Sequence, residues 1–411
     1  MRGIRFFAWV ALVALVSTLA YVPLVRLPAG AAAVQGLGAK TILIGVQVSL
    51  TGPASTVGQG FKAGTQMAVD EINAHGGING RHIDVVYEDD AGTAEGGISA
   101  VRRLIDQDKV FAIFGGGTST STASVIPLIQ QSKFLYYDSL ASDPRVLQNY
   151  SPYVFSGMTV VRADVAAYAA KVLGQTFKAH TVGFLSSDEA FCTSVLPMMI
   201  PRLADQGIKV ILQEKFKSGD TDFTAQANAI KSANPDAMYL CGLPADGGRL
   251  LPQLRRAGIA SKLLGDTVFG DTVVPKLAGP SADGFYALWI NSTQFMGEKT
   301  GAMGEWKARF AKAFPNPPPS TPNSFSLAGY ADFYVFADGL RRAGPNPTQD
   351  KVVDGLEHVH NFIAGKDSYF TWAVPIGLPR SFRNGDHKGN RECVLIVVKN
   401  GDYTRVENFG T

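Results

Sequence analysis

The stretch TILIGVQVSLTGPASTVGQGFKAGTQMAVDEINAHGGINGRHIDVVY, residues 41–87, contains one complete strand–helix–strand cycle. The apolar run Ile42–Val48 predicts a buried strand. Small and apolar residues then recur on one face of a helix: Phe61, Gly64, Ala68 and Ile72. Gly76 and Gly77 end this helix, and a second strand is predicted at His82–Tyr87. The unit is the building block of a parallel sheet covered by helices.

The same cycle repeats along the chain. Further strands are predicted at residues 110–114, 134–137, 181–185, 208–216, 237–240, 262–264 and 285–290, and helices at 94–105, 121–131, 191–204, 223–233, 248–257, about 305–313 and about 326–342. Because the cycle restarts after Arg162, we predict an α/β protein with two doubly wound parallel-sheet lobes. Asn400-Gly401 lies between two short apolar runs and predicts a C-terminal β-hairpin.

Composition and charge exclude several classes of partner. The chain has 411 residues, of which 46% are hydrophobic and 18% charged, as in globular proteins. Arg2, Arg5 and Arg26 lie in an N-terminal stretch without acids, which leaves 35 basic against 35 acidic residues in the remainder. A neutral body lacks the clustered basic charge that nucleic acids and anionic membranes require. We expect neither as a partner.

The N-terminal stretch is typical of a secretory signal peptide, residues 1–33. Two arginines precede an apolar run from Phe6 to Val25, and small residues follow, ending at Ala33. No cysteine near Ala33 could accept a lipid, so we expect an exported periplasmic protein that is not a lipoprotein. The apolar run is nearly as long as the ~20 residues of a membrane span, so an uncleaved anchor stays an alternative.

Three cysteines, Cys192, Cys241 and Cys393, allow at most one disulfide bridge. Three buried thiols acting as small apolar side chains are the interpretation that we favour. Pairing of Cys192 with Cys241 stays open at this point.

No motif for catalysis is present. The sequence has no P-loop and no G-x-S-x-G elbow. Gly58 and Gly60 resemble part of the glycine-rich dinucleotide-binding motif, but no strand leads directly into them. The pair His358 and His360 is interpreted as a surface pair rather than a metal site, and the acids Glu88–Asp90 as a cap for the next helix. We therefore expect no enzyme, no metal site and no cofactor.

Two hydroxyl-rich loops follow predicted strands and suggest a ligand site. The first, Phe114–Thr122, combines three glycines with five hydroxyl residues at the start of a helix, which suits a carboxylate or other anion. The second, Asp138–Pro144, follows the next strand and is expected beside it. Open α/β sheets bind ligands at this edge, outside the carboxyl ends of their strands.

Three segments together resemble the leucine/isoleucine/valine-binding proteins, which are type I periplasmic receptors of branched-chain amino-acid ABC transporters. The segments are Val48–Pro53 with Gly58, Gly64 and residues 68–80; Tyr87–Asp90; and Leu254–Gly258. The resemblance covers nearly all of residues 40–411. It implies a small-molecule ligand held between two lobes, a membrane permease and an ATPase as partners, and a monomer.

The same resemblance implies a three-strand hinge with crossovers near Ser156, Ala287 and Gly365. The N-terminal lobe would then comprise residues 40–156 plus 288–365. The C-terminal lobe would comprise residues 157–287 plus 366–411.

Carried over by position, the family's ligand contacts fall on residues of both lobes. The α-carboxylate contact falls on Ser119, beside Thr120, and the loop that holds the amino-acid group falls on Leu140, Ala141 and Ser142. The wall of the side-chain pocket falls on Val57, Phe191 and Leu243. The acid that pairs with the ligand ammonium falls on Thr267, with Asp266 one residue earlier.

The missing acid at Thr267 leaves the ligand class open. A buried ammonium without a carboxylate costs several kcal/mol in desolvation. The interpretation that we favour is that the ligand is an amino acid or related organic carboxylate. The alternative is that the ligand is an aromatic acid, keto acid or amide without an ammonium. A sensor ectodomain of the same fold is a further alternative, whereas no nucleophile, base and orienting group can be assembled for an enzyme.

Overall fold

The computed structural model describes residues 34–148, 150–157, 162–289, 297–366, 369–377, 379–388 and 393–409. The predicted signal peptide, residues 1–33, lies outside the described residues. Within the described ranges, no helix combines the length and the apolar character needed to cross a membrane.

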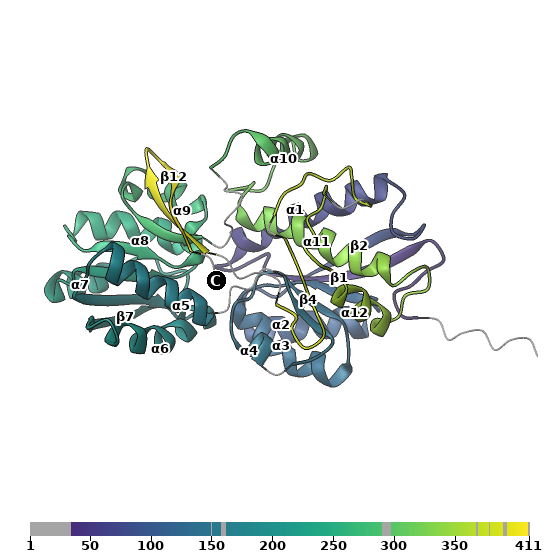
Figure 1. The fold of residues 1–411 in the computed structure, drawn as a ribbon, viewed down its shortest axis with the longest axis horizontal. Helices are drawn as coiled ribbons and strands as arrows, with labels where there is room; N and C mark the ends of the chain where they lie inside the picture. Colours follow the sequence, from purple (N-terminus) through teal and green to yellow (C-terminus); the bar gives the residue numbers. More distant parts are fainter. Residues whose placement is uncertain are drawn as a thin grey trace, which may run out of the picture. The chain divides into compact units, whose positions relative to one another are not determined.

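The first sheet has five parallel strands among the described residues, in the order β2-β1-β3-β4-β5. The strands are β1 (Thr41–Val48), β2 (His82–Asp89), β3 (Ala112–Gly115), β4 (Tyr136–Asp138) and β5 (Val154–Ser156). Its helices are α1 (Ser55–Ala74), α2 (Ala94–Asp106), α3 (Ser119–Ser132), α4 (Arg145–Gln148), α11 (Ser324–Arg342) and α12 (Gln349–Glu357). Helices α1, α11 and α12 cover one face, and α2 to α4 cover the other (Figure 1).

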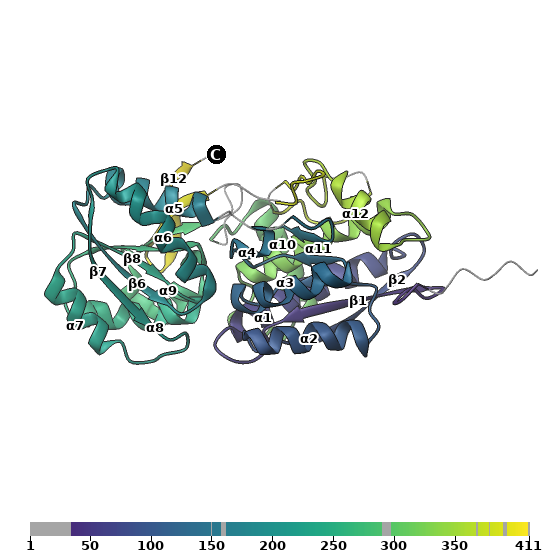
Figure 2. The same ribbon diagram turned by 90° about the horizontal axis from the view of Figure 1, so that it is seen from below.

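The second sheet has seven strands among the described residues, in the order β12-β11-β10-β9-β8-β6-β7. The strands are β6 (Thr181–Ser187), β7 (Lys209–Phe216), β8 (Ala237–Cys241), β9 (Lys262–Gly265), β10 (Tyr286–Trp289), β11 (Cys393–Lys399) and β12 (Asp402–Phe409). Helices α5 (Arg162–Lys171) and α6 (Ala190–Ala204) cover one face, whereas α7 (Thr224–Ala233), α8 (Pro244–Arg256) and α9 (Val273–Ala278) cover the other (Figure 2).

Both sheets repeat one topology, which confirms the predicted fold class. In each sheet the second strand in sequence lies at the edge beside the first, and the third to fifth strands follow on the other side. The predicted hairpin adds β11 and β12 as antiparallel strands to β10. The strand order reverses between β1 and β3 in one sheet and between β6 and β8 in the other, although both pairs are parallel. The loops after these strands are therefore where a ligand is expected.

Helix α11 comes late in the chain and covers the first sheet through close contact with α1. A Cβ atom on Gly64 would lie 1.8 Å from the carbonyl oxygen of Ser326, and one on Gly329 would lie 2.3 Å from that of Phe61. Only glycine permits such an approach of two helix backbones. This packing explains why Gly64 is part of the motif that carries the family resemblance.

Part of the segment before β11 packs against the first sheet. Arg380 Nε lies 3.0 Å from Asp332 Oδ1 on α11, and the ring of Phe382 packs on that of Phe155 in β5. Lys388 forms a parallel bridge with Ser156. These contacts attach residues 380–388 to the first sheet, although the predicted boundary after residue 365 assigns them to the C-terminal lobe. The segment has no regular period, and its attachment depends on individual aromatic and charged side chains.

Several element boundaries also differ from the prediction. Helix α3 begins at Ser119 rather than Ser121, because the side chain of Thr118 caps it. Helix α8 begins at Pro244 rather than Gly248, since the carboxylate of Asp246 accepts the N–H of Leu243 and stabilises an extra turn. The sequence did not predict β5, α5 or α12.

Candidate ligand-binding site

The loop from β3 to α3 exposes the start of a helix at the edge of the first sheet. Gly115 and Gly116 have φ values of 143° and 146°, in a region that disfavours residues with a Cβ atom. The hydroxyl of Thr118 accepts the N–H of Ser121 at 3.2 Å, so α3 begins at Ser119. The first N–H groups of the helix thereby point toward the carboxyl edge of the sheet, where an anion is favoured.

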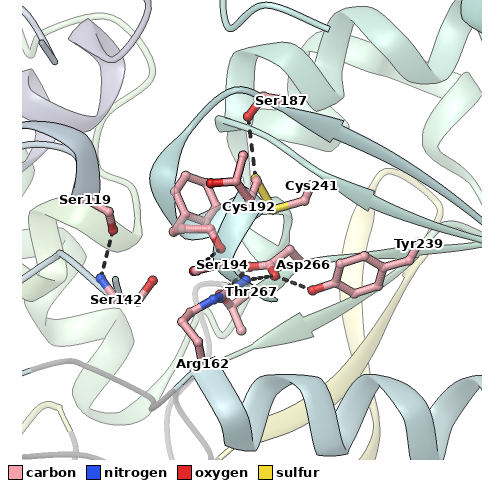
Figure 3. Close-up of polar contacts among 12 residues, drawn as sticks. Ser119, Ser142, Arg162, Ser187, Cys192, Ser194, Tyr239, Cys241, Asp266 and Thr267 are labelled. Atoms are coloured by element: carbon pink, nitrogen blue, oxygen red, sulfur yellow. Dashed lines mark hydrogen bonds and ion pairs between the residues drawn. A yellow bond between two sulfur atoms is a disulfide. The ribbon is translucent and has the colours of Figure 1, made fainter. Parts of the chain in front are cut away.

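The hydroxyls of this loop divide into a structural and a site-facing group. Thr118 donates to the carbonyl of Gly92, and Ser121 donates to the carboxylate of Asp90 at 2.8 Å. Ser119 Oγ instead accepts the N–H of Ser142 at 3.0 Å (Figure 3). The two predicted loops therefore meet through Ser119 and Ser142, whereas part of the hydroxyl run serves the fold alone.

Asp90 corrects the interpretation of the acidic run as a helix cap. Thr93 caps α2, and the buried carboxylate of Asp90 instead accepts four hydrogen bonds. The donors are Gln47 Nε2 at 2.8 Å, Ser49 Oγ at 2.5 Å, the N–H of Gly92 at 2.8 Å and Ser121 Oγ at 2.8 Å. Asp90 thus fastens the loops after β1, β2 and β3 to one another.

The second predicted loop is held by the buried carboxylate of Asp138, its first residue. Asp138 Oδ1 accepts the N–H groups of Leu140 at 3.2 Å and Ala141 at 2.9 Å, and Oδ2 accepts the hydroxyl of Ser156 at 3.0 Å. Burial raises the pKa of Asp138 to about 7, although these hydrogen bonds oppose the shift. The carboxyl links the predicted ligand loop to Ser156 at the end of β5.

The second lobe contributes a buried cluster of charged and aromatic side chains. Arg162 Nη1 lies 3.2 Å from Asp266 Oδ1, and Arg162 Nη2 lies 2.5 Å from Asp266 Oδ2. Tyr239 also donates to Asp266 Oδ2, and Thr267 donates to Oδ1 at 2.8 Å. The side chains of both Arg162 and Asp266 are 0% exposed. In Figure 3 this cluster lies to the right of Ser119 and Ser142.

Asp266 is therefore a structural carboxylate and not a free acid. Burial acts to raise its pKa, but the charge of Arg162 and the hydrogen bonds from Arg162, Tyr239 and Thr267 outweigh this effect and hold the pKa below its usual value. The guanidinium carbon of Arg162 also lies 5.7 Å from the ring centroid of Phe191 on α6. This contact joins the charged cluster to one wall residue of the expected pocket.

The remaining predicted wall residues lie at the starts of two separate helices. Val57 lies in the first turn of α1, and Leu243 precedes α8; both are 4% exposed. Sequence reasoning missed Arg162 and Tyr239. Arg162 had a detectable signal, since it ends the otherwise uncharged run Ser156–Val161 in the predicted crossover.

Comparison with known proteins supports the fold described above. A family model described as periplasmic binding protein matches residues 41–402. The chain belongs to the periplasmic binding protein family. A leucine-, isoleucine-, valine-, threonine-, and alanine-binding protein of Pseudomonas aeruginosa is 26% identical over 322 residues, which cover 78% of this chain and 83% of that protein. The predicted resemblance to leucine/isoleucine/valine-binding proteins is confirmed.

Two solved structures share the fold of this periplasmic binding protein. One is a branched-chain amino acid transporter substrate binding protein from Streptococcus pneumoniae in complex with isoleucine, with a TM-score of 0.74, 22% identity, and coverage of 90% of this chain and 100% of that one. The other is a solute binding protein of an ABC transporter from Rhodopseudomonas palustris in complex with 3,4-dihydroxy benzoic acid, with a TM-score of 0.75, 21% identity, and coverage of 90% and 97%.

In this periplasmic binding protein, Thr120 contacts the other lobe. Its hydroxyl donates to Glu189 Oε2 at 2.9 Å and accepts the N–H of Ala190, the first residue of α6, at 3.3 Å. A cavity of about 350 Å³ beside this contact is lined by Thr120, Asp188, Glu189, Lys217 and residues 91–95, among others. Burial raises the pKa of Glu189 to about 7; the Thr120 hydrogen bond opposes the shift, and the charges of Asp188, Asp246 and Asp90 add to it.

Stability is expected to fall as the pH rises through the range in which Glu189 ionises. The carboxyl ionises near its ordinary value of 4.5 in the unfolded chain and at about 7 in the folded protein. The contribution of Glu189 to the free energy of unfolding is fully present below pH 4.5 and is lost as the pH rises through 7. Between pH 5 and 8, the parent should lose roughly 2–3 kcal/mol more than Glu189→Gln, which stays neutral and keeps an acceptor for Thr120.

Urea unfolding of both proteins at several pH values measures this difference. Asp138 is present in both proteins, so its own titration cancels in the comparison. Parallel pH profiles for the parent and Glu189→Gln would contradict the assignment to Glu189.

A disulfide bond joins the first turn of α6 to the end of β8. Cys192 and Cys241 are bonded, with a Cα–Cα distance of 5.6 Å. The interpretation of three buried thiols is therefore wrong for these two residues and holds for Cys393, which is free and buried. The bond fixes the helix start that carries Glu189 and Phe191 to the strand that carries Tyr239.

The described residues contain no group of three or more histidine, cysteine, aspartate or glutamate side chains arranged to hold a metal ion.

Proposed function

We propose that this periplasmic binding protein is the extracytoplasmic receptor of an ABC importer and binds a small organic carboxylate. The ligand lies between the loops that carry Ser119 and Ser142 on one side and the cluster that includes Phe191 on the other. The receptor delivers it to a membrane permease with an ATPase. In this proposal residues 1–33 direct export, the mature protein is a periplasmic monomer, and no catalytic step takes place.

The observation that carries the proposal is the meeting of two predicted loops at the start of α3. Ser119 is the first residue of a 14-residue helix, and its Oγ accepts the N–H of Ser142 from the neighbouring loop. Because Ser119 Oγ is the acceptor in its bond with Ser142, its hydroxyl hydrogen remains available to donate to a ligand oxygen. Together with the positive end of the helix dipole, this arrangement suits a carboxylate.

The names of the relatives support a small acid of this kind and allow two classes. The Pseudomonas relative is named for leucine, isoleucine, valine, threonine and alanine, and the Rhodopseudomonas neighbour contains 3,4-dihydroxy benzoic acid, an aromatic acid without an ammonium. Both ligands share a carboxylate, which is the group that the Ser119 loop is proposed to bind.

Replacement of Ser119 by alanine is expected to weaken binding of the ligand carboxylate. Loss of one hydrogen bond to a charged group costs about 1.5–3 kcal/mol, or roughly ten- to a hundredfold in Kd. Aliphatic and aromatic amino acids, their 2-oxo acids and benzoic acids are first screened against the parent by thermal shift. Calorimetry then compares the best ligand in the parent and in Ser119→Ala.

Ser132→Ala is the matched control, because Ser132 is the exposed last residue of the same helix. It should bind the ligand as the parent does. Equal affinity of Ser119→Ala and the parent for every ligand found would remove the anion site from the proposal. If no acid binds the parent, the proposed function itself is wrong.

A further inference from the structure

The carboxylate at the expected ammonium position has no acceptor capacity left. An ionised carboxylate offers about four lone-pair positions. Asp266 Oδ1 accepts from Arg162 Nη1 and Thr267 Oγ1, and Oδ2 accepts from Arg162 Nη2 and the hydroxyl of Tyr239. All four positions are thus occupied by protein donors, and the charge of Asp266 is compensated by Arg162. A ligand ammonium at this place would meet no acceptor from Asp266.

The same cluster also contains a hydrogen-bond donor that has no partner among the described residues. Arg162 uses its two terminal nitrogens for Asp266, and its Nε atom is buried without a hydrogen-bond partner among the described residues. A buried N–H without an acceptor is costly, and most such groups in proteins find a partner. The guanidinium also lies beside the ring of Phe191, the aromatic residue at a predicted wall position of the pocket.

From these contacts we propose that Arg162 binds the ligand directly and selects acids that carry an oxygen acceptor, not an ammonium, opposite the Ser119 loop. This inference rests on the proposed function and names its substrate class: 2-oxo acids. The carboxylate of such a ligand lies at Ser119 and Ser142, and its second oxygen accepts the Nε–H of Arg162. An ammonium in that place would stand beside a cation and would lose its hydration without a partner.

The first test uses the parent protein and pairs of ligands that differ only at the α-carbon. Calorimetry compares leucine with 4-methyl-2-oxopentanoate, and phenylalanine with phenylpyruvate. The 2-oxo acid should bind at least about tenfold more tightly than its amine counterpart, as expected when a hydrogen bond to a charged group is gained. This comparison needs no variant to fold.

The second test removes both charges of the pair at once. Arg162→Gln/Asp266→Asn is neutral and keeps polar groups of similar size, and it should weaken binding of the preferred 2-oxo acid by roughly ten- to a hundredfold. The matched control is Arg103→Gln/Glu88→Gln, which neutralises an ion pair of 2.9 Å between α2 and β2 whose arginine side chain is 48% exposed. That control should bind as the parent does.

Each outcome bears on a different part of the inference. Tighter binding of the amino acid than of its 2-oxo acid in the parent would overturn the inference and leave the receptor function intact. Unchanged affinity in folded Arg162→Gln/Asp266→Asn would exclude Arg162 as a ligand contact. Failure of every acid to bind the parent would overturn the proposed function together with the inference.

Discussion

Replacing Arg162 with methionine is expected to lower the free energy of unfolding by about 3–5 kcal/mol, because the substitution leaves a buried carboxylate without its counter-charge. The side chains of Arg162 and Asp266 are both 0% exposed, so water cannot take the place of the guanidinium. Tyr239 and Thr267 would still donate to Asp266, but neither carries a charge. Urea unfolding in the absence of ligand measures the loss.

Two further variants separate the charge effect from packing. Arg162→Met/Asp266→Leu removes both charges and should recover most of the lost stability, since well-packed apolar residues often replace a buried ion pair at little cost. Arg103→Met makes the same substitution at the partly exposed pair with Glu88 and should cost less than about 1 kcal/mol. Equal losses in Arg162→Met and Arg103→Met would show that the Arg162 pair contributes no more than a surface ion pair.

Loss of the disulfide between Cys192 and Cys241 is expected to destabilise the protein by about 4 kcal/mol on the chain-entropy model, because the bond closes a long loop. The two residues are 49 positions apart and join α6 to β8. In Cys192→Ala/Cys241→Ala the unfolded chain regains the freedom that the bond removes. The comparison is made by urea unfolding with and without a reductant.

The reductant provides the internal control for this prediction. It should lower the unfolding midpoint of the parent and leave that of Cys192→Ala/Cys241→Ala unchanged, since Cys393 is a free thiol in both proteins. A parent whose midpoint does not respond to a reductant that reaches its cysteines would contradict a stabilising bond.

The local spacing of apolar and polar residues predicts most of the helices and strands of the fold. Strands such as Thr41–Val48 and helices such as Ala94–Asp106 have a clear period, and their type and position were predicted within a few residues. The loop at Ser119 was predicted as well, because glycines and hydroxyl residues between a strand and a helix have direct local consequences. These features depend on neighbours in the chain, which the sequence displays.

The charged parts of the site depend on distant partners and could not be predicted in the same way. Arg162 and Asp266 are 104 residues apart, and Ser139 and Asp332 are 193 apart. A single sequence does not show which of its many acids faces which base. Asp266 was therefore predicted as a ligand contact, whereas in the folded protein its four acceptor positions are all taken by side chains of the second lobe.

The packing of α11 on α1 has a consequence for the order in which the chain can fold. The five described strands of the first sheet are complete at Ser156, but the helix that buries α1 begins only at Ser324. Tyr330 and Tyr334 bond to Glu71 across 259 and 263 residues, so their contacts close very long loops. Contacts so distant in sequence slow folding and leave apolar surface uncovered until they form. During synthesis, the second sheet up to β10 is therefore complete before the first lobe can bury its own core.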